Sequence, residues 1–370
     1  MSYLDLSSVS KTYGGKVQAV KDLNLSINTG EIVALLGSSG CGKTSTLRMI
    51  AGFEDVTAGE IRVNGTAIHQ LPPARRGVAM AFEGYSLYPP LTIRENIAFA
   101  MKAERLDAAQ VETRVKDIAR LVELEDVLDR YPSSVSGGQQ QRASLARALV
   151  RKADLHLLDE PMGQLEPQLR ALLRGRVKHF IQERGLTAIL VTHDQTEANA
   201  LADKIAVMED GELQQFDTPT ALKDNPANLF TGTFIGEPPM NVFPAGMRRE
   251  NRQVIFGLGD GVSLAYDEAR FSPDLRDRLE KNRDQIAIGV RPHAVRLSED
   301  GLPAEVLVNQ WLGDQTHIAA SFAGGSIVSV IHDRAKVQAG ERVGVSVAPE
   351  DLHIFDGSTG TAISHGGQLA

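Results

Sequence analysis

The chain has 370 residues, a formal net charge of −8 at pH 7, 42% hydrophobic residues and a single cysteine, which together describe an ordinary soluble protein with room for two or three domains. The acidic balance argues against nucleic acid as the main partner, and one cysteine excludes an internal disulfide and fits a reducing compartment. Because we find neither a signal-peptide pattern nor an apolar run near the ~20 residues of a membrane span, we expect a cytoplasmic protein that can still dock on a membrane complex.

The first thirty residues alternate apolar and polar side chains, which is typical of short strands in a half-exposed sheet. Gly14-Gly15 makes the turn between two such strands. Tyr13 lies directly before this turn, and its ring suits either stacking on a base or a small strand core. Spacing alone leaves these two interpretations equal.

A phosphate loop follows the next apolar run. Residues 32–36 predict a buried strand, residues 45–50 predict a helix, and between them lies the pattern G-x-x-x-x-G-K-[ST] in its required context. The loop glycines let successive N–H groups turn toward a phosphate chain, and the helix N-terminus adds positive potential. Lys43 is predicted to reach the β- and γ-phosphates, and the Thr44 hydroxyl to ligate Mg²⁺. The nucleotide-binding residues of this segment are Gly37, Ser38, Ser39, Gly40, Cys41, Gly42, Lys43, Thr44 and Ser45.

The segment after the phosphate loop predicts two strands and a helical insert. A strand at 59–63 ends in the Asn64-Gly65 turn, and a buried strand at 77–82 ends at Glu83. A loop with aromatic and proline residues follows. From Thr92 to about Val127 apolar residues recur with a helical period, so we predict a helical subdomain over about residues 85–150.

A second anion-binding turn lies before the helix predicted at 143–150. Its residues are Ser136, Gly137, Gly138 and Gln139. A Ser-Gly-Gly turn at a helix start offers N–H donors at the positive end of the helix dipole. One nucleotide needs only one such cradle, so two of them predict that nucleotides are shared between two subunits.

Acidic and imidazole side chains end two further apolar strands. Asp159, at the end of residues 154–159, is placed to hold Mg²⁺ through a water, and Glu160 is placed to polarise an attacking water. His193 follows the strand at 187–192, where ligand groups gather in open α/β sheets. Taken alone, two surface acids at a strand end are an equally good interpretation, and a lone histidine is more often structural.

With these motifs in this order, residues 3–235 resemble an ATP-binding cassette (ABC) ATPase. The resemblance implies an α/β P-loop NTPase with a RecA-like core, an antiparallel β subdomain and a helical subdomain, using ATP and Mg²⁺. It implies a head-to-tail dimer in which each ATP lies between one subunit's phosphate loop and the other's Ser136–Gln139 turn. Tyr13 resembles the adenine-stacking aromatic residue, Glu160 the catalytic carboxylate and His193 the γ-phosphate switch. The catalytic set is then Lys43, Glu160 and His193, and the metal set is Thr44, Glu83 and Asp159.

The C-terminal part predicts a different fold class. Residues 236–243 are rich in turn formers and look like a linker, and short β segments follow, which predicts a small all-β, OB-like barrel. We place the domain boundary between residues 236 and 237. Met240-Asn241 and residues 288–292 resemble the regulatory domain of sugar, polyol and glycerophosphate importer ATPases.

That subgroup resemblance implies partners and a location. Two integral membrane permease subunits would dock near residues 85–91 and the helical insert, and an extracytoplasmic solute-binding protein would act indirectly. The chain would lie on the cytoplasmic face of the inner membrane. Binding of the solute is delegated to other chains, so the solute itself is not encoded here.

Three features depart from the family's usual pattern: one residue after a strand, one loop and one residue before the Ser136–Gln139 turn. Glu83 stands where the family has a glutamine that ligates Mg²⁺ and senses the membrane subunit. A glutamate can still ligate Mg²⁺, but its charge near the triphosphate should make nucleotide binding depend more on the metal. The loop 163–166 reads Gly163-Gln164-Leu165-Glu166 where the family usually has Ser-Ala-Leu-Asp, and Val135 is a mild change from Leu. We therefore hypothesise that the subunit pairs with a second, different ATPase.

Two other functions remain open. A cassette protein of DNA repair or translation would need a long coiled-coil insertion or a second cassette, which this sequence does not contain. A degenerate regulatory partner that holds ATP without splitting it is favoured by Glu83 and Glu166. The intact Glu160 and His193 oppose that alternative.

Overall fold

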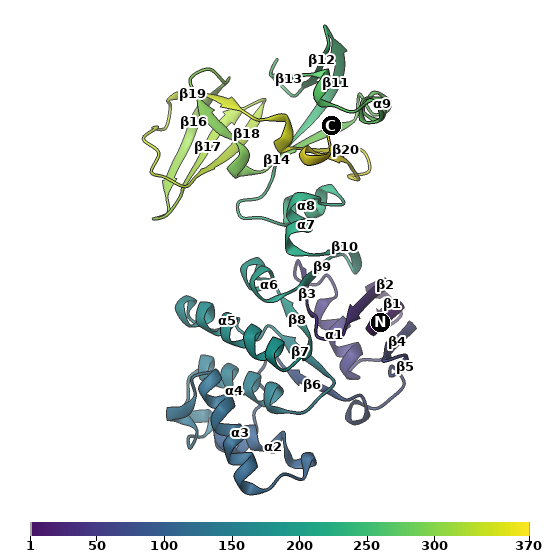
Figure 1. Ribbon diagram of the computed structural model, residues 1–370, viewed down its shortest axis with the longest axis vertical. Helices are drawn as coiled ribbons and strands as arrows, with labels where there is room; N and C mark the ends of the chain where they lie inside the picture. Colours follow the sequence, from purple (N-terminus) through teal and green to yellow (C-terminus); the bar gives the residue numbers. More distant parts are fainter. Residues whose placement is uncertain (1, 370) are drawn as a thin grey trace. The chain divides into compact units, whose positions relative to one another are not determined.

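The computed structural model describes residues 2–369, and the chain divides into two compact units, residues 1–219 and 220–370 (Figure 1). The domain boundary suggested by the sequence, between residues 236 and 237, falls inside the second unit and stays a prediction. Among the residues described, no helix is both long enough and apolar enough to cross a lipid bilayer.

The first unit is built on a six-stranded sheet in the order β10-β9-β3-β8-β7-β6. Five of its strands are parallel, and β10 pairs antiparallel with β9 at the edge. Every residue of β3, β7 and β8 is buried, because the sheet is covered on both faces, and such strands read as continuous apolar runs. The strands are β3 (Ile32–Gly37), β6 (Val78–Ala81), β7 (Leu155–Asp159), β8 (Thr187–Thr192), β9 (Lys204–Glu209) and β10 (Glu212–Asp217).

An antiparallel sheet in the order β2-β1-β4-β5 packs beside this core. The predicted Gly14-Gly15 turn is confirmed, with both residues at positive φ, and it joins two strands of twelve residues each. Leu47 and Ile50 of α1 (Lys43–Ala51) share one hydrophobic cluster with Leu35 of β3 and with side chains of the antiparallel sheet. The strands are β1 (Ser2–Tyr13), β2 (Val17–Asn28), β4 (Ala58–Val63) and β5 (Thr66–Ala67).

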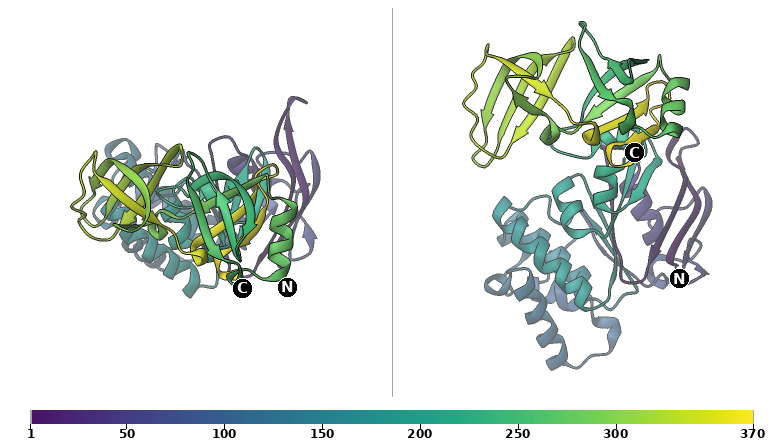
Figure 2. Two further views of the ribbon diagram at one scale, coloured as in Figure 1. Left: turned by 90° about the horizontal axis from the view of Figure 1, so that it is seen from above. Right: turned by 45° about the horizontal axis from the view of Figure 1, so that its top comes forward.

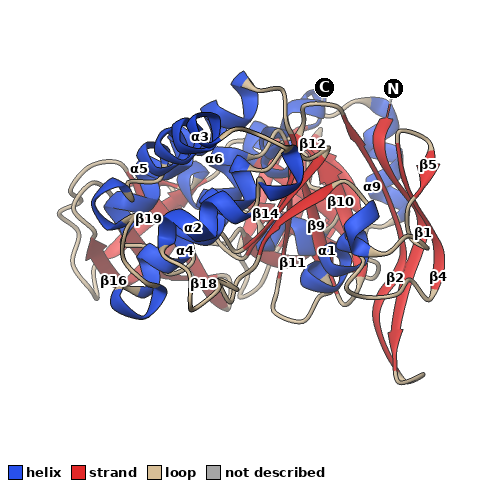
Figure 3. Ribbon diagram, turned by 90° about the horizontal axis from the view of Figure 1, so that it is seen from below, coloured by secondary structure: helices blue, strands red, loops and turns tan. Residues whose placement is uncertain are grey.

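The predicted helical insert is present but is not one continuous periodic segment. Residues 100–107 interrupt it, because Arg105 adopts a left-handed conformation (φ 53°) and Asp107 caps a new helix with a capping box. Figures 1 and 3 show α1 on the side of the antiparallel sheet and the helices α4, α5 and α6 on the opposite face of the parallel sheet. The helices are α2 (Ile93–Phe99), α3 (Ala108–Leu121), α4 (Gly137–Val150), α5 (Pro167–Glu183) and α6 (Gln195–Leu201).

One buried histidine in this core should make stability depend on pH. His156 of β7 is fully buried, and both ring nitrogens lack a hydrogen bond of normal geometry. Burial lowers the pKa of His156 from 6.5 to about 4. Between these values the unfolded chain binds a proton that the folded chain does not, so the free energy of unfolding falls as the pH drops through this window.

We expect this histidine to cost about 2 kcal/mol of stability between pH 7 and pH 5. The loss in free energy of unfolding from pH 7 to pH 5 should be smaller in His156→Leu than in wild type by about 2 kcal/mol. Denaturant unfolding at both pH values measures it. His179→Leu on the exposed face of α5 is the matched control and should keep the wild-type pH dependence. If the free energy of unfolding changes equally with pH in wild type and in His156→Leu, His156 is not the source of the pH dependence.

The second unit is mainly β-structure, which confirms the all-β prediction for the C-terminal part. Figure 2 shows its two sheets, in the orders β13-β12-β11-β14-β20-β21 and β15-β19-β16-β17-β18. Side chains of both, such as Phe256 and Ile288 of the first and Phe322 of the second, form one core. Its strands are β11 (Asn241–Glu250), β12 (Gln253–Gly257), β13 (Ser263–Asp267), β14 (Ile286–Val290), β15 (Arg296–Ser298), β16 (Leu302–Trp311), β17 (Thr316–Phe322), β18 (Gly325–Ile331), β19 (Arg342–Ser346), β20 (Leu352–Asp356) and β21 (Ala362–His365), and its helices are α7 (Pro219–Asp224), α8 (Leu229–Phe234) and α9 (Pro273–Lys281).

Candidate active site

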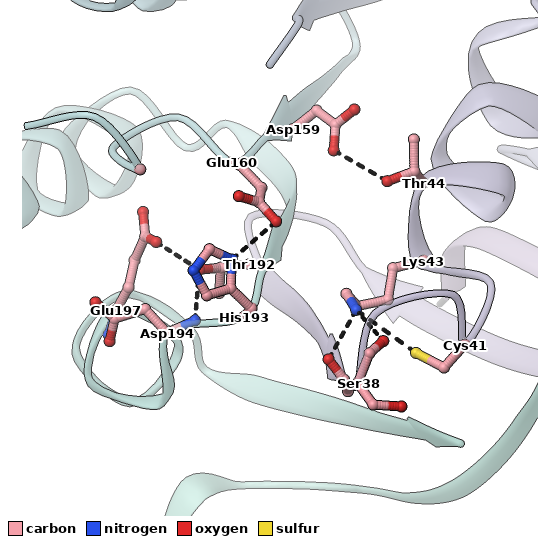
Figure 4. Close-up of polar contacts among 12 residues, drawn as sticks. Ser38, Cys41, Lys43, Thr44, Asp159, Glu160, Thr192, His193, Asp194 and Glu197 are labelled. Carbon is pink, nitrogen blue, oxygen red and sulfur yellow. Dashed lines mark hydrogen bonds and ion pairs between the residues drawn. The ribbon is translucent and has the colours of Figure 1, made fainter. Parts of the chain in front are cut away.

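The parallel sheet brings together segments that are far apart in the sequence. Leu36 of β3 lies beside Thr192 of β8, and Asp159 of β7 lies beside Val191 of β8. The carboxyl ends of these three strands therefore meet at one edge, where open α/β sheets bind their ligands. Figure 4 shows the residues that follow the strands gathered at this edge.

Lys43 folds back over the phosphate loop. Its Nζ donates to the carbonyl oxygens of Gly37 at 2.7 Å and Ser38 at 2.8 Å, and it lies 3.6 Å from Cys41 Sγ. The loop needs glycine at Gly42, which has φ 102° and where a Cβ atom would lie 2.4 Å from the Ala19 carbonyl oxygen. The lysine charge is thus held against the backbone of a tightly folded loop.

The start of α1 is open to an anion. Gly42 provides no side-chain cap, so the first N–H groups of this nine-residue helix have no intrahelical or capping acceptor. Lys43 adds a positive charge at the same place. A phosphate chain fits these donors, because it accepts from backbone N–H groups and favours the positive end of a helix.

Thr44 and Asp159 face each other across the edge of the sheet, with 3.5 Å between Thr44 Oγ1 and Asp159 Oδ1. Asp159 is 3% exposed. Burial raises its pKa to about 6, and the negative charges of Glu83 and Glu160 act in the same direction, while Arg48 opposes them. The charge of Glu83, the carboxylate that follows β6, therefore acts on Asp159.

These oxygen donors fit Mg²⁺ bound together with a nucleotide. Among residues 2–369 we find no group of three His, Cys, Asp or Glu side chains that could hold a metal by itself. Mg²⁺ typically uses one or two carboxylates together with phosphate oxygens and water. Thr44, Asp159 and Glu83 supply a hydroxyl and carboxylates of that kind.

Glu160 and His193 form a pair next to the phosphate loop. Glu160 Oε1 lies 2.9 Å from His193 Nδ1. Glu160 adopts a left-handed conformation with φ 45°, and its backbone N–H donates to the Val191 carbonyl oxygen at 2.9 Å. The side chain of Glu160 is 24% exposed and that of His193 is 66% exposed. Both groups are thus open to a ligand at the carboxyl edge of the sheet.

The segment around His193 is braced by residues that sequence analysis missed. The Thr192 hydroxyl donates to Glu197 Oε2 at 2.6 Å and accepts from the Asp194 backbone N–H at 3.1 Å. Burial raises the pKa of Glu197 to about 7. Arg170 of α5 contacts Asp194 Oδ2 at 2.9 Å and donates to the Gly163 and Leu165 carbonyl oxygens. Glu197 and Arg170 lie inside amphipathic helices, where nothing in the sequence pattern sets them apart from ordinary surface residues.

The remaining predicted residues lie around this centre. Tyr13 is partly exposed and is not a member of the buried core. Its hydroxyl lies 3.1 Å from Ser45 Oγ, and Lys11 Nζ lies 4.8 Å from its ring centroid. A ring beside the start of α1 favours the base-stacking interpretation.

The Ser136–Gln139 turn is not gathered with the phosphate loop of its own chain. It begins α4, on the opposite face of the parallel sheet from α1. Ser136 Oγ accepts from the Gln139 N–H at 3.3 Å, and Gln139 Oε1 accepts from the Ser136 N–H at 2.9 Å. This reciprocal cap holds the turn in shape, with Ser136 exposed and the next three residues half-buried.

The chain is similar to known ATP-binding proteins of transporters along nearly its whole length. Residues 20–163 match the family model described as ABC transporter, and residues 288–355 match the TOBE domain. The chain is 39% identical to an sn-glycerol-3-phosphate import ATP-binding protein of Cereibacter sphaeroides, over 97% of this chain and 99% of the relative. It is 38% identical to a xylose/arabinose import ATP-binding protein of Haloferax volcanii, over 98% and 96%. It is 36% identical to a lactose transport ATP-binding protein of Rhizobium radiobacter, over 97% and 99%.

A solved structure resembles part of this chain in fold and sequence. It is the dimeric post-hydrolysis state of an ATP-binding cassette with bound ADP and Pi, at 29% identity and a TM-score of 0.55, covering 58% of this chain and 98% of that chain.

Proposed function

The chain belongs to the family of ABC transporter ATPases with a C-terminal TOBE domain, and from this premise we propose that it energises import of a sugar, a polyol or a glycerophosphate. The names of its full-length relatives support this solute class. The observation that carries the hydrolytic role is the Glu160–His193 pair, 2.9 Å apart beside the phosphate loop. The decisive test is ATP-dependent uptake of these solutes by vesicles that contain the chain and its permease.

The residues of the site have distinct proposed roles. The N–H groups of the phosphate loop and Lys43 bind and orient the triphosphate, and Tyr13 stacks on the base. Thr44, Asp159 and Glu83 would hold Mg²⁺, which would supply positive charge next to the triphosphate. Glu160 orients and polarises the attacking water, and His193 holds Glu160 and contacts the γ-phosphate. Phosphoryl transfer requires mainly such positioning and charge stabilisation.

We infer that two nucleotides lie between two cassettes. The cassette that it resembles is a dimer with bound ADP and Pi. The preformed Ser136–Gln139 turn lies on the other face of the sheet from α1, so it is free to complete the site of a partner. ATP-driven closure of the dimer would then transmit movement to the permease.

An aromatic groove in the first unit is the proposed docking site for the permease. It encloses about 330 Å³ and includes Phe53, Phe82, Tyr88, Phe99 and Arg147. Three of these aromatic side chains are unusually exposed, with Phe53 at 53%, Tyr88 at 44% and Phe99 at 38%. Exposed aromatic clusters with an arginine are typical of protein interfaces. The groove lies next to the loop 85–91, where the sequence predicted this contact.

The alternative function is a degenerate regulatory subunit in a heterodimer. Its basis is Glu83, whose negative charge contributes to the raised pKa of Asp159, together with the departures in the loop 163–166. Steady-state Mg²⁺-ATP hydrolysis by the purified chain separates the two functions. Turnover by the chain alone supports the catalytic function. An inert wild type that becomes active as Glu83→Gln supports the regulatory one.

If Glu83 belongs to the metal site, Glu83→Gln should make ATP binding less dependent on Mg²⁺. The ratio of the ATP Kd in EDTA to that in Mg²⁺ should fall roughly five-fold, because one negative charge near the triphosphate is removed. Fluorescent-nucleotide titration with and without Mg²⁺ measures this ratio. Glu183→Gln, exposed at the end of α5, is the control, and an unchanged ratio in Glu83→Gln would place Glu83 outside the metal site.

A further inference from the structure

The turn that follows Glu160 is held by a buried amide to which the proposed mechanism assigns no role. Gln141 lies in the second turn of α4, the helix that begins at the Ser136–Gln139 turn, and is 3% exposed. Its Nε2 donates to the Glu160 carbonyl oxygen at 2.7 Å. Its Oε1 accepts from the Gln164 backbone N–H at 2.8 Å. One side chain therefore binds both ends of the turn 160–164.

The chemistry of this contact requires glutamine. A primary amide carries a donor and an acceptor on one planar group, so it can meet a carbonyl oxygen and an N–H at once. A glutamate of the same length only accepts, and a methionine does neither. Since buried backbone groups need partners, loss of the Gln141 amide leaves two of them unsatisfied in the turn.

The contact fixes a residue whose backbone is unusual. Glu160 has φ 45°, a conformation that non-glycine residues seldom adopt without support. Its N–H donates to Val191, its carbonyl oxygen accepts from Gln141, and its carboxylate meets His193. Without the Gln141 contact, the peptide group after Glu160 is free to rotate. The Glu160 carboxylate is then no longer held in its orientation toward His193.

A second side chain contacts the same turn from the groove side. The Tyr85 hydroxyl donates to Gln164 Oε1. Tyr85 lies in the loop 85–91, and Arg147 holds the backbone of that loop. Arg147 donates to the Ser86 carbonyl oxygen at 2.6 Å and to that of Tyr85 at 3.1 Å. Arg147 also lies 5.7 Å from the ring centroid of Tyr88, in the aromatic groove. The turn after Glu160 is therefore contacted both by α4 and by the loop 85–91 next to the aromatic groove.

We propose that Gln141 and Tyr85 are positioning residues that fix the turn after Glu160 and connect it to the start of α4 and to the aromatic groove. The inference rests on the proposed hydrolytic role of Glu160. Within the described residues, neither side chain hydrogen-bonds to the phosphate loop. Both should therefore act on kcat and leave ATP binding unchanged.

The first arm of the test is steady-state ATP hydrolysis with Mg²⁺ by the full-length chain. We expect kcat to fall roughly ten-fold in Gln141→Met and roughly three-fold in Tyr85→Phe, with KM for ATP within about two-fold of wild type. Matched controls are Gln182→Met, at an exposed position of α5, and Tyr131→Phe, whose residue is 52% exposed. Unchanged kcat in both test variants, or a rise in KM at constant kcat, overturns the proposal.

The second arm needs no turnover. Hydrogen exchange of the nucleotide-free chain should show the Gln164 amide exchanging at least about five-fold faster in Gln141→Met. An unchanged rate overturns the proposal. If Gln141→Met does not fold, as judged by circular dichroism, kcat and KM of Tyr85→Phe decide. If wild type has no turnover, the proposed function fails instead, and the exchange result alone decides this inference.

Discussion

Glu160→Gln should lower steady-state ATP hydrolysis by at least about 100-fold, because an amide cannot accept a proton from the attacking water. ATP binding should survive, since the phosphate loop and Lys43 are untouched. The variant keeps the size of the side chain, and its amide can still meet His193 Nδ1, which lies 2.9 Å from the wild-type oxygen. It should therefore hold ATP with Mg²⁺ and accumulate as a closed dimer, seen as an ATP-dependent shift in size-exclusion chromatography.

Glu212→Gln is the control for this variant, since Glu212 is an exposed residue of β10 that pairs with Lys21. It should keep wild-type turnover. Residual hydrolysis within ten-fold of wild type in Glu160→Gln would show that another group activates the water. Equal, negligible rates in wild type and variant would support the degenerate regulatory subunit.

Lys43→Ala should weaken nucleotide binding and abolish turnover. Lys43 Nζ is 2.7 Å from the Gly37 carbonyl oxygen and 2.8 Å from that of Ser38, so the charge is already positioned at the loop. Charge-assisted contacts to phosphate contribute about 1.5–3 kcal/mol each, so we expect the Kd for ATP to rise roughly 10- to 100-fold. Titration with a fluorescent ATP analogue measures the change.

A thermal-shift measurement gives an independent check on Lys43. Saturating ATP should raise the apparent Tm of wild type, because a ligand that binds only the folded state stabilises it. The shift should nearly vanish in Lys43→Ala and persist in Lys281→Ala, which removes an exposed lysine at the end of α9. An unchanged shift in Lys43→Ala would mean that the nucleotide binds elsewhere.

The local motifs of this chain were fully visible in its sequence. The phosphate loop, the Ser136–Gln139 turn and the strand ends at Asp159 and His193 each depend on residues that are neighbours in the chain. The fold class was also predictable from local sequence. Strands that are buried on both faces of a sheet appear as apolar runs, such as residues 32–36.

Some elements could not be predicted, because their local sequence favours a different structure. β11 contains Pro244 and Gly246, and a proline argues against a strand. It is tolerated because β12 pairs with β11 only from Gly246 onward, so Pro244 has a neighbouring strand on one side only, that of β14. The break in the helical insert was hidden similarly, because the apolar period continues across residues 100–107 while Arg105 and Asp107 end one helix and begin another.

The sequence by itself determined which chemistry this protein carries, because loops, caps and strand ends are local structures set by a few adjacent residues. The tertiary structure alone decided which groups meet. Glu160 approaches His193 because β7 and β8 are adjacent parallel strands, and Gln141 reaches Glu160 because α4 packs on that sheet. A glutamine inside a helix looks like any surface residue in sequence. Its role arises only when strand order and helix packing bring it to a backbone that needs a donor and an acceptor.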